Sequence, residues 1–154
     1  MKYATMMTCM IGLMFGGQIS LAQTYSKKFT EREKTLGNQC IEVYSNNPEN
    51  GDLIVSTCKQ NLADMRALRE MTSGLTDIDI RMFNLYTSMT NAILTIGVLR
   101  QNGNRPTSTV CSYARDAVGL GKQVGFRKDS DFEAIVQNMV NGYEKYILPS
   151  CPAP

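Results

Sequence analysis

The chain has 154 residues, with 16 Lys and Arg against 14 Asp and Glu, and it contains no histidine. A formal net charge of +2, spread along the chain, argues against a nucleic-acid-binding protein, because such proteins need a concentrated basic surface. The absence of histidine excludes a Ser-His or Cys-His catalytic pair and any metal site built on imidazole.

The first 22 residues have the pattern of a secretory signal peptide. Lys2 precedes an apolar stretch over residues 6–15, and residues 20–22 supply a small-x-small cleavage motif. The apolar stretch is about half as long as the roughly 20 residues needed to span a bilayer. We therefore expect cleavage after residue 22, a single helical domain over 23–154, and a periplasmic or secreted protein. No later segment is apolar enough to predict an integral membrane segment in the mature chain.

The hydrophobic pattern after residue 30 predicts helices and no strand. A first helix is expected over 31–45, with Thr30 and Glu33 at the spacing of a capping box. A turn rich in Asn, Pro and Gly ends it. A second helix is expected over 52–73, with Asp52 as its N-cap.

The third predicted helix, from Thr76 or Asp77 to about Gln101, is the longest and the most apolar. Its apolar residues fall on two stripes, where a surface helix normally carries one. The first stripe contains Ile78, Met82, Leu85, Tyr86, Met89, Ile93, Ile96 and Leu99. The second contains Ile80, Phe83, Leu94 and Val98. We favour a central helix that packs on two sides, and the alternative is that the second stripe binds a partner or forms a homodimer.

A fourth helix is expected to begin near Thr107 or Ser108 and to end in a glycine-rich loop. Gly119, Gly121 and Gly125 do not have the spacing of a phosphate-binding loop, so we interpret them as a helix end.

A fifth helix is expected over 132–147, and its start carries a second capping box formed by Ser130 and Glu133. The inward stripe predicted for it contains Phe132, Ile135, Val136, Met139, Val140, Tyr143 and Ile147. Pairs of aspartates precede this helix and begin the third one. We interpret them as capping and dipole-stabilising residues, since neither site has the ligands of a calcium loop.

After the signal peptide the cysteines are Cys40, Cys58, Cys111 and Cys151. An even set in an exported chain predicts disulfides, and no Cys-x-x-Cys redox motif is present. In an antiparallel hairpin Cys40 and Cys58 lie at the same level, about six residues from the connecting turn. Cys111 and Cys151 are level in the same way. The predicted fold is therefore a small all-α, five-helix bundle with the disulfides Cys40–Cys58 and Cys111–Cys151.

No catalytic, cofactor-binding or metal-ligating set is recognisable, so we do not expect an enzyme or a bound cofactor. We expect a module that binds another envelope or secreted protein by surface complementarity. The candidate partner-binding residues are Ile80, Phe83, Leu94, Val98, Asn102, Arg105 and Tyr113. In size, export and cysteine-bearing helical plan, the chain is similar to immunity proteins that block secreted amidases, which implies an inhibitor of a cell-wall hydrolase.

Two other functions fit the same features. The protein could be a structural accessory of a secretion or conjugation apparatus in the envelope. It could also be a carrier of a small apolar ligand or a chaperone, with the third helix lining a cavity.

Overall fold

The computed structural model describes residues 31–152, which contain five helices and no strand. The predicted all-α bundle with two disulfides is confirmed. Its cysteine pairs are Cys40–Cys58 and Cys111–Cys151, with Cα–Cα distances of 4.9 and 5.7 Å. The predicted signal peptide and Thr30 lie outside the described residues.

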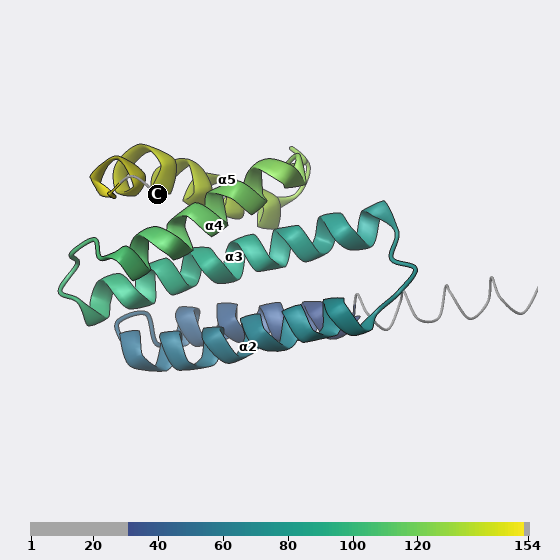
Figure 1. Cartoon of the computed structure of the whole chain (residues 1–154), viewed down its shortest axis with the longest axis horizontal. Coiled ribbons are helices and arrows are strands. Elements are labelled where there is room, and N and C mark those ends of the chain that lie inside the picture. Colours follow the sequence, from purple (N-terminus) through teal and green to yellow (C-terminus); the bar gives the residue numbers. More distant parts are fainter. Residues whose placement is uncertain (1–30, 153–154) are drawn as a thin grey trace, which may run out of the picture.

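The helices form two hairpins on opposite sides of a central helix (Figure 1). They are a helical segment over 31–46, α2 (Gly51–Met71), α3 (Asp77–Gln101), α4 (Ser108–Val124) and α5 (Asp131–Gly142). The segment 31–46 and α2 run antiparallel below α3 in the view, while α4 and α5 lie above it. The central position predicted for the third helix is therefore what the structure shows.

Both apolar stripes of α3 supply the core because the helix is covered on two sides. Ile93 and Leu94 are fully buried, and Val98 is 4% exposed. The middle of α3 also buries hydroxyl and amide side chains, and most of these bond to backbone carbonyls of the helices. Thr90 donates to the Tyr86 carbonyl, and Ser88 donates to the Ala117 carbonyl of α4 at 2.7 Å. The centre of the bundle is therefore partly polar.

Two helix starts differ in how closely they follow the prediction. Thr76 forms a full capping box with Asp79 at the start of α3, as the acid-rich sequence there predicted. For α2, the predicted N-cap Asp52 is wrong. Asn50 holds that position, since its side-chain oxygen accepts a hydrogen bond from the Leu53 amide at 3.0 Å.

The two capping boxes predicted around glutamates are not formed as expected. The carboxylate of Glu33 is fully buried and makes no hydrogen bond with any residue in the described range 31–152. Ser130 does cap α5 by accepting from the Glu133 amide. The Glu133 carboxylate, however, accepts from the Arg127 amide at 2.8 Å, three residues ahead of the cap.

The end of α4 was predicted correctly at Gly125 but not at Gly119 and Gly121. The helix continues through Gly119 and Gly121 and ends only at Gly125, which has a left-handed backbone with φ of 62°. Gly121 is kept small by packing, because a Cβ atom there would lie 2.8 Å from the Val140 side chain of α5. This glycine allows close helix contact and does not terminate the helix.

The fifth helix is shorter than predicted, because its last turns widen into a π-helix over Tyr143–Ile147 and a 3₁₀ turn over Leu148–Ser150. Two residues assigned to inward stripes are exposed: Ile78 at 73% and Ile135 at 53%. The first turn of α3 extends beyond the ends of α4 and α5, which leaves Ile78 uncovered (Figure 1).

Candidate binding surface at the loop end

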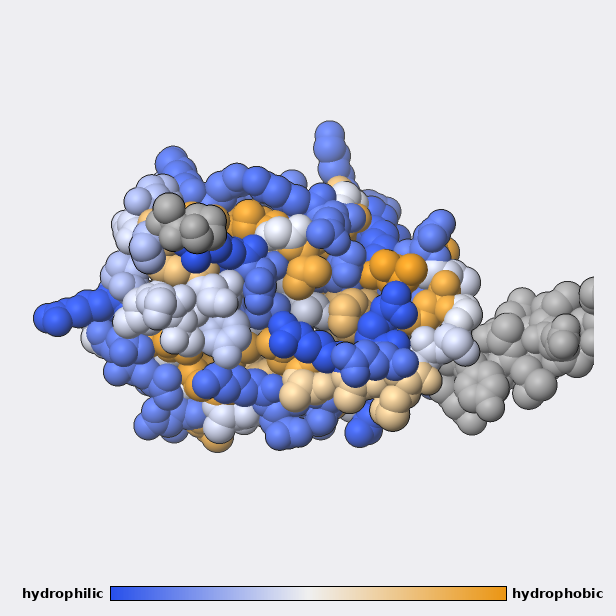
Figure 2. All heavy atoms as spheres, in the orientation of Figure 1, coloured by the Kyte–Doolittle hydropathy of each residue, from blue (hydrophilic) through white to orange (hydrophobic). Residues whose placement is uncertain are grey.

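Three segments outside the α-helices lie at the same end of the bundle, on the left of Figure 1. They are the turn 47–50, the loop 102–107 and the C-terminal residues 148–152. We call this region the loop end, and we include in it the adjoining helix ends over 51–52 and 100–101. In the space-filling view the corresponding part of the surface is mainly hydrophilic (Figure 2).

The loop 102–107 is held in one conformation by its own hydrogen bonds. The Asn104 amide donates to the Leu99 carbonyl at 2.7 Å, and the Asn102 side chain donates to the Val98 carbonyl at 2.7 Å. Asn104 has a positive φ of 61°, a conformation that asparagine tolerates better than most residues. The exposed side chains of Asn102 and Arg105 therefore project from a fixed backbone.

A surface recess of about 350 Å³ lies beside this loop, between the start of α2 and the end of α3. Its lining residues are Glu49, Asn50, Gly51, Asp52, Arg100 and Gln101. On one wall, the Gln101 side chain donates a hydrogen bond of 2.7 Å to the Asp52 carboxylate. The helices approach closely here, since a Cβ atom on Gly51 would lie 2.8 Å from the Gly97 carbonyl oxygen.

Arg100 is the cation of the recess, and its guanidinium is incompletely bonded. The group lies 5.7 Å from the centre of the Tyr44 ring. Its ion pair with Glu49 is long, at 3.6 Å, and the Glu49 side chain is 88% exposed. The Nη1 nitrogen is buried and has no hydrogen-bond partner among the described residues. A guanidinium with unused donors is suited to bind a carboxylate.

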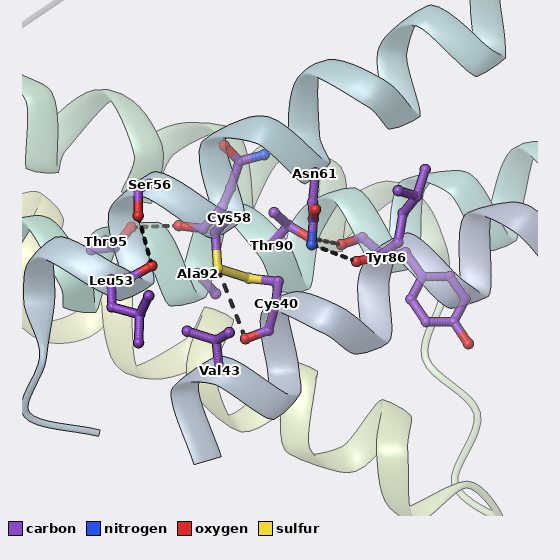
Figure 3. The surroundings of a disulfide bond; sticks show 12 residues. Cys40, Val43, Leu53, Ser56, Cys58, Asn61, Tyr86, Thr90, Ala92 and Thr95 are labelled. Atoms are coloured by element: carbon purple, nitrogen blue, oxygen red, sulfur yellow. Dashed lines mark hydrogen bonds between the residues drawn. A yellow bond between two sulfur atoms is a disulfide. The ribbon is translucent and has the colours of Figure 1, made fainter. Parts of the chain in front are cut away.

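The two disulfides brace the helices that carry the loop end. Cys111, in the first turn of α4, is bonded to Cys151 of the C-terminal tail, and Arg115 donates to the Pro152 carbonyl nearby. The Cys40–Cys58 disulfide joins segment 31–46 to α2 and lies beside Thr90, Ala92 and Thr95 of α3 (Figure 3). In the oxidised protein one disulfide therefore joins segment 31–46 to α2, and the other joins the start of α4 to the C-terminal tail.

The structure does not bring the predicted partner-binding residues together on one face. Asn102 and Arg105 lie at the loop end and are exposed, while Tyr113 is half-buried on α4. Ile80 and Phe83 are half-buried in the first half of α3, toward the opposite end. Leu94 and Val98 belong to the core, so neither is accessible to a partner. Treating them as contact residues was incorrect, because both sides of α3 are covered.

A buried ion network at the opposite end of the bundle was not predicted. Glu133 is 1% exposed, and its carboxylate accepts hydrogen bonds from Arg81 at 3.1 Å and from the Arg127 side chain at 3.0 Å. Arg81 also donates to the Val124 and Gly125 carbonyls. Burial alone would raise the pKa of Glu133, but the hydrogen bonds from Arg81 and Arg127 lower it to about 2. This network fastens α3, the end of α4 and the start of α5 together.

Within residues 31–152, no group of three or more Cys, Asp or Glu side chains is arranged to hold a metal ion. None of the helices described is both long and apolar enough to cross a membrane. Comparison of the chain with protein-family models, with curated proteins and with solved structures finds no match.

Proposed function

We propose that the protein is an exported module that binds another envelope or secreted protein, and that the loop end is its contact surface. The observation that carries this proposal is an exposed polar loop, 102–107, that is hydrogen-bonded to the end of α3 and lies at the same end of the bundle as the Cys111–Cys151 disulfide. A surface fixed before binding loses little conformational entropy on association, so more of its contact energy appears as affinity.

The chemistry of the loop end favours a partner that presents a carboxylate. The Arg100 side chain is 22% exposed, and its Nη2 nitrogen has only a long ion pair to the exposed Glu49. Arg105 adds a second exposed cation on the neighbouring loop. Arginines are enriched among the residues that dominate binding energy in protein interfaces. An acidic side chain of the partner would displace Glu49 and bond to Arg100.

An inhibitor or immunity-type protein against a cell-wall hydrolase is the specific form of this proposal. The partly polar interior of α3, with Ser88, Thr90 and Asn91 buried, gives less support to a carrier of apolar ligands. A structural accessory of an envelope apparatus would use the same surface, and the partner composition distinguishes the two.

The proposal is tested by co-purification of the tagged protein from its native envelope, with mass spectrometry of the bound proteins. Arg105→Glu is compared with Lys128→Glu, which reverses an exposed charge at the opposite end of the bundle. We expect one stoichiometric partner with the wild type and with Lys128→Glu, and at least a tenfold weaker recovery with Arg105→Glu. A set of secretion subunits would favour the accessory function. Equal recovery with both variants would contradict the assignment of the loop end.

A further inference from the structure

Glu33 in the helical segment 31–46 has a fully buried carboxylate. Its side chain is 0% exposed, and neither carboxylate oxygen has a hydrogen-bond partner among residues 31–152. A carboxylate that loses water and gains no donor strongly favours its neutral, protonated form. The surroundings of Glu33 therefore favour the protonated form of this residue in the closed structure.

The charged and titratable groups that face Glu33 strengthen this preference. Burial has the largest effect on the pKa of Glu33 and raises it. Repulsion by Asp79 on α3 raises this pKa further, while attraction by Arg69 on α2 lowers it. Together they raise the pKa of Glu33 from 4.5 to about 8. Tyr86 on α3 is also close, and burial followed by the influence of Glu33 raises the pKa of its phenol. Asp79 is itself 4% exposed and serves in the capping box of α3.

The described contacts of residues 31–39 are made by Leu36 and Gly37, and a disulfide follows at Cys40. Leu36 enters the core, and its carbonyl accepts a hydrogen bond from the Asn61 side chain of α2 at 2.9 Å. Gly37 packs directly against the Tyr86 ring. Cys40 follows and is joined to α2 by its disulfide (Figure 3). This disulfide would keep the rest of the segment attached to α2 if residues 31–39 left the bundle.

We propose that residues 31–39 form a proton-dependent arm, which is docked on α2 and α3 while Glu33 is protonated and is released as the pH rises. In the released arm Glu33 is exposed to water and has its ordinary affinity for protons. Between pH 4.5, the ordinary pKa, and about pH 8, the raised pKa, the ratio of released to docked arm increases about tenfold for each unit by which the pH rises. Release uncovers Tyr86 and the core site of Leu36, so apolar surface appears at neutral to alkaline pH. This inference does not depend on the proposed partner.

Hydrogen exchange of the backbone amides of residues 35–39, measured on the oxidised protein from pH 5.5 to 7.5, tests the arm. Intrinsic exchange rises tenfold per pH unit, so a variant without the proton linkage has a slope of 1 in log rate against pH. The wild type should have a slope of about 2, which makes the ratio of its rate to that of Glu33→Gln rise about 100-fold over this range. Glu33→Met is a second variant without a titrating group, and it should match Glu33→Gln.

The matched control is Glu42→Gln, which removes an exposed glutamate from the same segment and should keep the wild-type slope. Amides 54–62 of α2 should show no additional slope, because α2 stays in place when the arm opens. A wild-type slope of 1 in the arm would overturn the proposal. The same additional slope in α2 would also overturn it, since the linkage would then belong to unfolding of the whole bundle.

Discussion

Replacing Glu133 with Gln is expected to remove most of the stability that the buried ion network provides. The folded pKa of Glu133 is about 2, against an ordinary value of 4.5. At 1.36 kcal/mol per pKa unit, this difference corresponds to about 3 kcal/mol of folding free energy at neutral pH. The glutamate is 1% exposed, so solvent screens the network little on its side, although Arg127 is 61% exposed. Breaking one partner of a buried ion pair typically costs a similar amount.

Urea denaturation of oxidised protein, followed by circular dichroism at pH 7 and at pH 3, measures the effect. Because the folded pKa is lowered, the stabilisation is complete above about pH 4.5 and is lost as the pH falls toward 2. The wild type should therefore lose stability between these values, and Glu133→Gln should lose much less. The matched control is Glu144→Gln, whose partner Lys122 is 59% exposed and whose own side chain is 49% exposed. This exposed pair should contribute under about 0.5 kcal/mol. Equal costs for the two variants at pH 7 would refute the reasoning.

Three further tests, the first with a matched control variant, address the packing, cross-linking and hydrogen bonding of the bundle. Gly97→Ala should lower the free energy of unfolding by about 1–3 kcal/mol in urea denaturation, because the added Cβ would lie 2.8 Å from the Ile54 side chain. The control Gly119→Ala has open space around the added Cβ, so it should leave the free energy of unfolding unchanged or raise it by under about 1 kcal/mol. Replacing Cys111 and Cys151 together with Ser should cost about 4 kcal/mol by loop entropy, since the disulfide closes a separation of 40 residues; an unchanged urea midpoint would contradict this. Tyr143→Phe should cost about 1 kcal/mol, because the buried hydroxyl donates to the Ala92 carbonyl at 2.6 Å; a cost near zero would show that this hydrogen bond contributes nothing.

Local sequence patterns were sufficient to predict the helices and the disulfides. The helical period and the turn residues located all five helices to within a few residues, apart from the ends of α4 and α5. Register in an antiparallel hairpin was sufficient to pair Cys40 with Cys58, since both lie about the same distance from the turn. The third helix starts where it was predicted, with Thr76 as its N-cap and Asp79 in a capping role.

The features that sequence reasoning missed depend on partners distant in the chain. Glu133 has the spacing of a capping residue, yet its carboxylate bonds to Arg81, which is 52 residues away. Glu33 has the same local spacing, and its burial follows from packing against α2 and α3. Gly121 looks like a helix terminator until the Val140 side chain of α5 is placed beside it. A local sequence pattern does not show which residues distant in the chain come into contact.

The candidate contact surface could be predicted only in part. Asn102 and Arg105 were identified because a polar loop between two helices is normally exposed. Arg100 was not identified, since its unused donor becomes visible only when α2 and α3 are packed together. Leu94 and Val98 were misassigned because a second apolar stripe has the same sequence pattern whether it meets a partner or another helix of the same chain.

The most direct test of the account is a hydrogen-exchange footprint of the protein in complex with the partner recovered by co-purification. We predict slower exchange in the turn 47–52 and the loop 100–107, with unchanged exchange in the α4–α5 turn over 125–130. Protection of that α4–α5 turn, or of the outer face of α5, with no change at the loop end would contradict the proposed contact surface.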